Sequence, residues 1–66
     1  MKILINGEER EIPDNFFLGE ILEYFELPAQ RIAIELNRNV IRRSEWGEIR
    51  IAADDRIEII HFVGGG

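Results

Sequence analysis

Residues 2–12 of the chain read KILINGEEREI, and this stretch specifies the beginning of the fold. Ile3 and Ile5 recur at every second position, a spacing typical of a strand with one buried face. Asn6-Gly7 follows, and an Asn-Gly pair favours a type I′ hairpin turn because both central residues need a positive φ. The sequence therefore predicts a β-hairpin. We place its strands near residues 2–6 and 9–12.

After the hairpin, the apolar spacing changes to that of a helix face. Pro13-Asp14-Asn15 is typical of a turn, in which Asp14 or Asn15 can cap the first N–H groups of a helix. Pro28 is expected to end that helix because proline cannot continue it. One helix is therefore predicted near residues 16–26. Its apolar stripe has four members, Leu18, Ile21, Leu22 and Phe25.

The rest of the chain returns to the spacing of strands. Residues 32–36 predict a third strand, 40–41 a short edge segment and 56–62 a last strand. Between them, Ser44 is expected to cap a short helical turn and Trp46 to close one end of the core.

A hairpin, one helix and a last strand that returns beside the first describe an α+β domain, the β-grasp or ubiquitin-like roll. Parallel pairing of the first and last strands would make both central in a mixed sheet of four to five strands. One main helix would cover one face, and the other face would stay open. We expect residues 1–63 to form this single domain and 64–66 a flexible glycine tail. The expected sheet core is Ile3, Ile5, Ile32, Ile34, Leu36, Ile57 and Ile59.

The open face is predicted to carry apolar side chains where polar ones are usual. By strand alternation these are Leu4, Ala33, Ile60 and Phe62. A clustered apolar patch beside the tail favours a docking site for a partner. Scattered surface residues or self-association would explain the same pattern.

Composition excludes several classes of function. The chain has 66 residues and a net charge of −5, which disfavours nucleic-acid binding. It has no cysteine, and therefore neither disulfides nor thiolate chemistry of its own. It has no apolar run long enough for a membrane span and no signal peptide, so we expect a cytoplasmic protein that is monomeric when free.

The side chains do not form an evident active site. Ser44 and His61 are the single serine and histidine, and we interpret them as a helix cap and a packed imidazole rather than a catalytic pair. Adjacent carboxylates, such as Asp54-Asp55, lack the spacing of metal ligands, so no metal or bound cofactor is expected. Gly64–Gly66 is not a phosphate loop, because no helix follows it.

One reactive group remains, the terminal carboxylate of Gly66. It is ionised at neutral pH and needs another enzyme to activate it. Gly64 and Gly65 have no Cβ, so they could thread a narrow channel in a partner's active site. The tail is therefore interpreted as the functional part of the chain.

These residues resemble the ThiS-like sulfur carriers of thiamine biosynthesis. The matching stretches are ILING, IAIELN, VI, RSEW, DRIEI and the terminal VGGG. RSEW together with a terminal Gly-Gly is the most specific of them. The chain departs from the pattern at Arg42, where a proline is usual, and at Asp54-Asp55, which replaces a Gly-Asp turn.

The resemblance implies a carrier cycle and no catalysis by the chain itself. An adenylyltransferase of the ubiquitin-activating type would use ATP to adenylate the Gly66 carboxylate. A sulfur donor system, beginning with a cysteine desulfurase, would displace AMP and leave a thiocarboxylate. Thiazole synthase would then take up the sulfur.

Other functions share these features. A sulfur carrier for molybdopterin, tRNA thiolation or cysteine synthesis would have the same tail, as would a ubiquitin-like protein modifier. A non-covalent binding module would need the open face and not the tail. A small enzyme would need Ser44 or His61.

Overall fold

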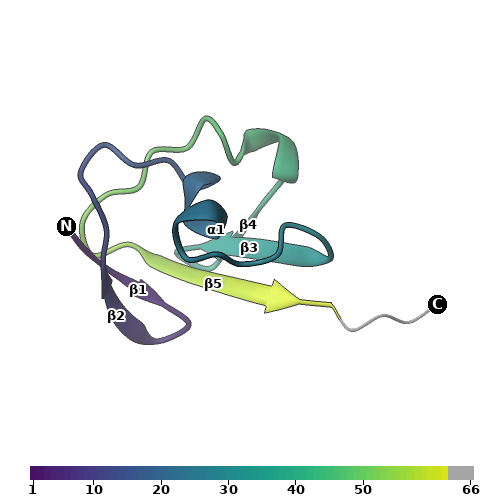
Figure 1. Cartoon of the computed structure of the whole chain (residues 1–66), viewed down its shortest axis with the longest axis horizontal. Helices are drawn as coiled ribbons and strands as arrows, with labels where there is room; N and C mark the ends of the chain where they lie inside the picture. Colours follow the sequence, from purple (N-terminus) through teal and green to yellow (C-terminus); the bar gives the residue numbers. More distant parts are fainter. Residues whose placement is uncertain (63–66) are drawn as a thin grey trace.

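The computed structural model describes residues 1–62, so the predicted glycine tail at 64–66 and the end of the predicted domain at Val63 lie outside the described residues. Its elements follow the predicted order (Figure 1). They are β1 (Lys2–Ile5), β2 (Glu8–Glu11), α1 (Glu20–Tyr24), β3 (Ile32–Leu36), β4 (Asn39–Ile41), the 3₁₀ helix η1 (Arg43–Glu45) and β5 (Arg56–His61).

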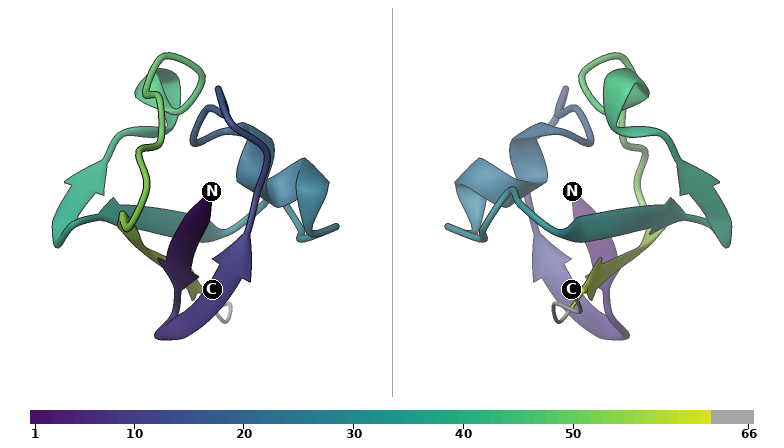
Figure 2. Two further views of the ribbon diagram at one scale, coloured as in Figure 1. Left: turned by 90° about the vertical axis from the view of Figure 1, so that its left-hand side faces the viewer. Right: turned by 90° about the vertical axis from the view of Figure 1, so that its right-hand side faces the viewer.

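The strands form one five-stranded mixed sheet in the order β2-β1-β5-β3-β4. β1 and β5 run parallel, with Leu4 opposite Arg56 and Ile5 opposite Ile57, and all other neighbours are antiparallel. The first and last strands of the chain are therefore central, as predicted. α1 lies against one face of the sheet (Figure 2), so the predicted α+β architecture is confirmed.

The hairpin that opens the chain is confirmed in its turn type. Asn6 has a φ of 49° and Gly7 a φ of 82°, the two positive values that a type I′ turn requires. A similar turn joins β3 to β4, where the φ values of Asn37 and Arg38 are 49° and 73°. Both hairpins have two-residue loops, which hold their strands in a defined register.

The prediction that the helix starts near residue 16 is wrong, because this segment pairs with a distant one. The Leu18 N–H donates to the Ile49 carbonyl at 2.8 Å, and the Ile51 N–H donates to the Phe16 carbonyl at 2.8 Å. This pairing buries Phe16, Leu18 and Ile51. Such long-range contacts override a local helical pattern, and α1 begins only at Glu20.

The predicted helix cap is also wrong. The N-cap residue of α1 is Gly19, and no side chain caps it. Asn15 instead accepts a hydrogen bond from the Arg50 guanidinium at 2.9 Å, which supports the paired segment ahead of the helix.

The helix ends before Pro28, so the predicted stop signal is not what terminates it. Glu26 has a φ of 55°, and the Leu27 N–H donates to the Leu22 carbonyl at 2.7 Å. The Glu26 N–H donates to the Glu23 carbonyl at 3.2 Å, which completes a Schellman motif. α1 is therefore a short helix, and the chain after it leads to the start of β3, where Ile32 lies opposite His61 at the end of β5.

The core is one cluster of buried side chains between α1 and the sheet. Five of the seven predicted sheet residues are buried, while Leu36 and Ile59 are only half-buried. Trp46 closes one end as predicted, and its indole N–H donates to the Ile41 carbonyl at 3.0 Å. The buried cluster is Ile3, Ile5, Ile12, Phe16, Leu18, Ile21, Leu22, Ile32, Ile34, Trp46, Ile51 and Ile57.

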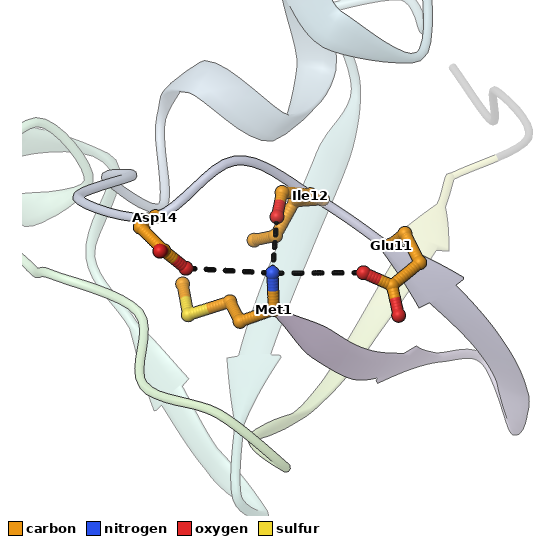
Figure 3. A network of polar contacts seen from close by, with 4 residues as sticks. All are labelled: Met1, Glu11, Ile12 and Asp14. Atoms are coloured by element: carbon orange, nitrogen blue, oxygen red, sulfur yellow. Dashed lines mark hydrogen bonds and ion pairs between the residues drawn. The ribbon is translucent and has the colours of Figure 1, made fainter.

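The amino group of Met1 ties the start of β1 to the segment that follows β2 (Figure 3). It donates to the Ile12 carbonyl at 2.6 Å and lies 3.6 Å from the Glu11 carboxylate and 3.5 Å from that of Asp14. Both carboxylates are exposed, so these ion pairs stabilise the fold only weakly.

Candidate functional site

The candidate site is the end of β5, the central strand that leads to the predicted tail at Gly64–Gly66 (Figure 1). β3 supports this strand along its length. Ile32 lies opposite His61, and the Phe62 N–H donates to the Arg31 carbonyl at 2.7 Å. The chain therefore approaches its terminus from an anchored strand.

On its other side, β5 extends beyond the end of β1. The Asn6 N–H donates to the Ile57 carbonyl at 2.9 Å, after which β1 has turned into its hairpin. The Asn6 side chain takes over: its Oδ1 accepts from the Ile59 N–H at 2.8 Å, and its Nδ2 donates to the Ile59 carbonyl at 3.5 Å. Sequence reasoning used Asn6 only as a turn residue, because nothing local shows which strand its side chain contacts.

Three of the four predicted docking residues lie together. Ala33 and Ile60 are direct partners across β3 and β5, and Phe62 follows two residues later on the same face. Ile60 is 41% exposed and Phe62 is 55% exposed, and strand alternation places both on the face opposite the buried Ile57. We call Ala33, Ile60 and Phe62 the β5 patch.

Leu4 does not join the β5 patch. It lies opposite Arg56, four residues before Ile60 and therefore about 13 Å away along the strand. It is half-buried, and the neighbouring Lys2 ammonium lies 3.6 Å from the Glu9 carboxylate. The expected four-residue face thus divides into a charged end at Leu4 and an apolar end at Ile60 and Phe62.

Two carboxylates border the β5 patch. Glu35 and Glu58 are direct cross-strand partners on the same face, with Val40 of β4 next to Glu35. Like charges placed opposite each other in a sheet disfavour folding slightly, so this pair does not contribute to stability. Its position next to apolar side chains gives the open face an acidic border.

A groove of about 540 Å³ lies on the helix side of the same strand end, and the sequence did not predict it. Leu27 and Pro28, which follow the end of the short α1, line it together with residues of the sheet. Ile59 is half-buried here rather than fully in the core. The groove is lined by Ile5, Asn6, Glu8, Arg10, Phe25, Leu27, Pro28, Ile32, Ile59 and His61.

Neither residue of the considered catalytic pair occupies its predicted place. Ser44 lies inside η1 and caps nothing, because the N-cap position belongs to Arg42. His61 is exposed at the groove rim rather than packed, since the short helix does not reach it. Within residues 1–62, no hydrogen bond joins the two side chains.

The described part of the chain also shows no metal centre: no group of three carboxylate, imidazole or thiol side chains gathers there. In the same residues, no helix has the length and apolarity needed to cross a membrane. The predicted modification site at Gly66 lies outside the described residues.

A mixed sheet with parallel central strands and one helix across it defines the class of the β-grasp proteins. The structure is similar to a crystal structure of a thiamine biosynthesis protein (ThiS) from Geobacter metallireducens, with a TM-score of 0.88, 25% identity and full coverage of both chains. The ThiS family model matches residues 3–66. The chain therefore belongs to the ThiS family.

Two kinds of relative share this sequence. The sulfur carrier protein ThiS of Bacillus subtilis is 32% identical over 63 residues, which cover 94% of this chain and 96% of that protein. A thiazole synthase of Magnetococcus marinus is 35% identical over 66 residues, all of this chain. The chain spans 20% of the length of that synthase.

Proposed function

We propose that this chain is a cytoplasmic sulfur carrier that holds sulfur as a thiocarboxylate on Gly66 for thiazole synthesis in the thiamine pathway. Membership of the ThiS family supports the class, and the name of the Bacillus subtilis relative supports the role of sulfur carrier. The observation that carries the proposal is the position of β5: a central, doubly supported strand runs past an exposed apolar patch toward a terminal Gly-Gly-Gly.

The proposed chemistry needs partner enzymes at each step. A carboxylate oxygen of Gly66 attacks the α-phosphorus of ATP on an adenylyltransferase, and pyrophosphate leaves. A persulfide, supplied by a system that begins with a cysteine desulfurase, attacks the carboxyl carbon, and AMP leaves with the bonding electrons. A second thiol then attacks the donor-side sulfur of the resulting acyl disulfide, forms a disulfide with the donor and releases the terminal sulfur on Gly66. Gly66 then ends in a thiocarboxylate, and the chain's own side chains bind no cofactor in this cycle.

Thiazole synthase is the proposed acceptor. The Magnetococcus marinus relative, named thiazole synthase, contains a segment similar to this whole chain, which supports a functional link between the two. Gly64 and Gly65 would thread the active sites of the synthase and the adenylyltransferase, since a chain without Cβ atoms fits a narrow channel. The β5 patch would rest on the surface around each channel.

The test is an intact-mass measurement after incubation with ATP, a ThiS-activating adenylyltransferase and a sulfur source. Exchange of one oxygen for sulfur adds nearly the same mass as oxidation of Met1, so the product is also treated with a thiocarboxylate-specific alkylating reagent. An alkylated species supports the carrier, and untreated product of the same incubation is then offered to thiazole synthase as a sulfur donor. An unmodified chain beside a modified Bacillus subtilis ThiS control contradicts the proposal.

Charge placed in the β5 patch is expected to weaken docking without unfolding the protein. We expect Ile60→Asp to lower kcat/KM for adenylation at least tenfold, because a charge at the centre of an apolar contact must be desolvated. Val40→Asp is the matched control: Val40 is 71% exposed on the same face, two strands from β5. Equal effects of the two substitutions on kcat/KM would show that the patch is not the docking surface.

A further inference from the structure

Two turn asparagines hold the two ends of β5. Asn6 bonds to the Ile59 backbone through both atoms of its amide. Asn37 accepts from the Arg56 N–H at 2.9 Å through Oδ1 and donates to the Asp55 carboxylate at 3.1 Å. Both have a φ of 49° at the first position of a type I′ turn, so their backbones are equivalent.

The two asparagines differ in where they act. Asn37 holds the start of β5, where β1 and β3 both pair with the strand. β1 pairs with β5 only as far as Ile57. Asn6 holds Ile59, two residues further along the strand. Among residues 1–62, the Asn6 amide therefore supplies the last hydrogen bonds from the β1 side before Phe62, while β3 continues on the other side.

We propose that Asn6 is a positioning residue for the tail: its side-chain amide replaces the missing peptide group of β1 and fixes the direction in which β5 delivers Gly66 to a partner's active site. This inference rests on the proposed carrier function. With the Asn6 side-chain amide in place, the backbone of Ile59 is bonded on the β1 side. Its neighbours Glu58 and Ile60 are held by β3 on the other side. Without it, the strand end keeps the support of β3 alone.

The physical consequence concerns geometry more than affinity. Without the Asn6 amide, only β3 fixes the direction of β5 at Ile59, and Gly66 follows seven residues later. A change at Ile59 alters the position and direction from which the chain continues toward Gly66. Reactions between bound groups are sensitive to misplacements of about 1 Å, which can cost up to a hundredfold in rate.

The test compares Asn6→Gly with Asn37→Gly in the complete chain. Glycine accepts the positive φ at both positions, so each variant removes an amide and leaves the turn intact. Thermal unfolding of both variants identifies a temperature at which each is fully folded. At that temperature we expect Asn6→Gly to lower kcat for adenylation about tenfold relative to Asn37→Gly, with KM changed less than about twofold.

Amide hydrogen exchange gives a readout that does not depend on the partner. We expect the Ile59 amide to lose protection at least tenfold in Asn6→Gly, whereas in Asn37→Gly it keeps the protection of the unsubstituted chain. Asn6→Asp is the second variant, because a carboxylate keeps the acceptor for the Ile59 N–H and loses the donor. Asn6→Asp is expected to retain the protection of the Ile59 amide. Its kcat for adenylation is expected to lie between those of Asn6→Gly and Asn37→Gly.

The outcomes separate this inference from the function on which it rests. If the unsubstituted chain is not adenylated, the proposed carrier function fails. If it is adenylated and Asn6→Gly has the same kcat as Asn37→Gly, or if the Ile59 amide stays protected in Asn6→Gly, the positioning role of Asn6 is overturned.

Discussion

Deletion of Gly66 is expected to abolish formation of the thiocarboxylate while leaving the fold intact. The shortened chain still ends in a glycine carboxylate, but that group lies up to about 3.5 Å short of its place. Since productive geometry tolerates far smaller errors, we expect kcat/KM for adenylation to fall at least a hundredfold. The measurement is the intact-mass and alkylation assay with equal amounts of both chains.

The chain without Gly66 also provides two controls. Its free energy of unfolding should match that of the full chain within about 0.5 kcal/mol, because the buried cluster lies between Ile3 and Ile57. It should also inhibit adenylation of the full chain competitively, since the β5 patch is unchanged. Modification of the deleted chain at the full rate would show that the Gly66 carboxylate is not the reacting group.

Ile57→Ala is expected to destabilise the fold strongly. Ile57 is fully buried on the central strand β5, opposite Ile5 of β1 and Leu36 of β3. Removing its side chain leaves a cavity between α1 and the sheet and should cost about 4 kcal/mol. A domain of this size has a total stability of about 3–10 kcal/mol, so much of the population would unfold.

Ile60→Ala on the same strand is the matched control. Ile60 is 41% exposed on the opposite face, so its loss should cost less than about 1 kcal/mol. Urea unfolding followed by the fluorescence of Trp46, the single tryptophan, measures both. Similar losses for Ile57 and Ile60 would contradict the assignment of the two faces of β5.

Much of the fold followed from local patterns. Asn6-Gly7 predicted the hairpin turn, because few residue pairs accept two positive φ values. The alternation at Ile3 and Ile5 identified the buried face of β1, since side chains of a strand alternate between faces. The order of the elements limited the topology, and parallel central strands followed from it.

The helix and the candidate site were harder to predict, because they depend on contacts between distant segments. Leu18 belongs to the predicted helical stripe, and only the pairing of residues 16–18 with residues 49–51 made that segment extended. Leu4 and Ile60 share a face in any alternation pattern. Only the register of β1 against β5 showed that they lie at different ends of that face.

By itself, the sequence determined the strand pattern, the hairpin turn and the terminal Gly66 carboxylate as the candidate reacting group, since each depends on residue type and near-neighbour spacing. Tertiary structure alone decided where α1 begins, where the groove opens and that the Asn6 amide holds Ile59. These features arise from the packing of residues far apart in the chain, whose relative positions no local pattern specifies.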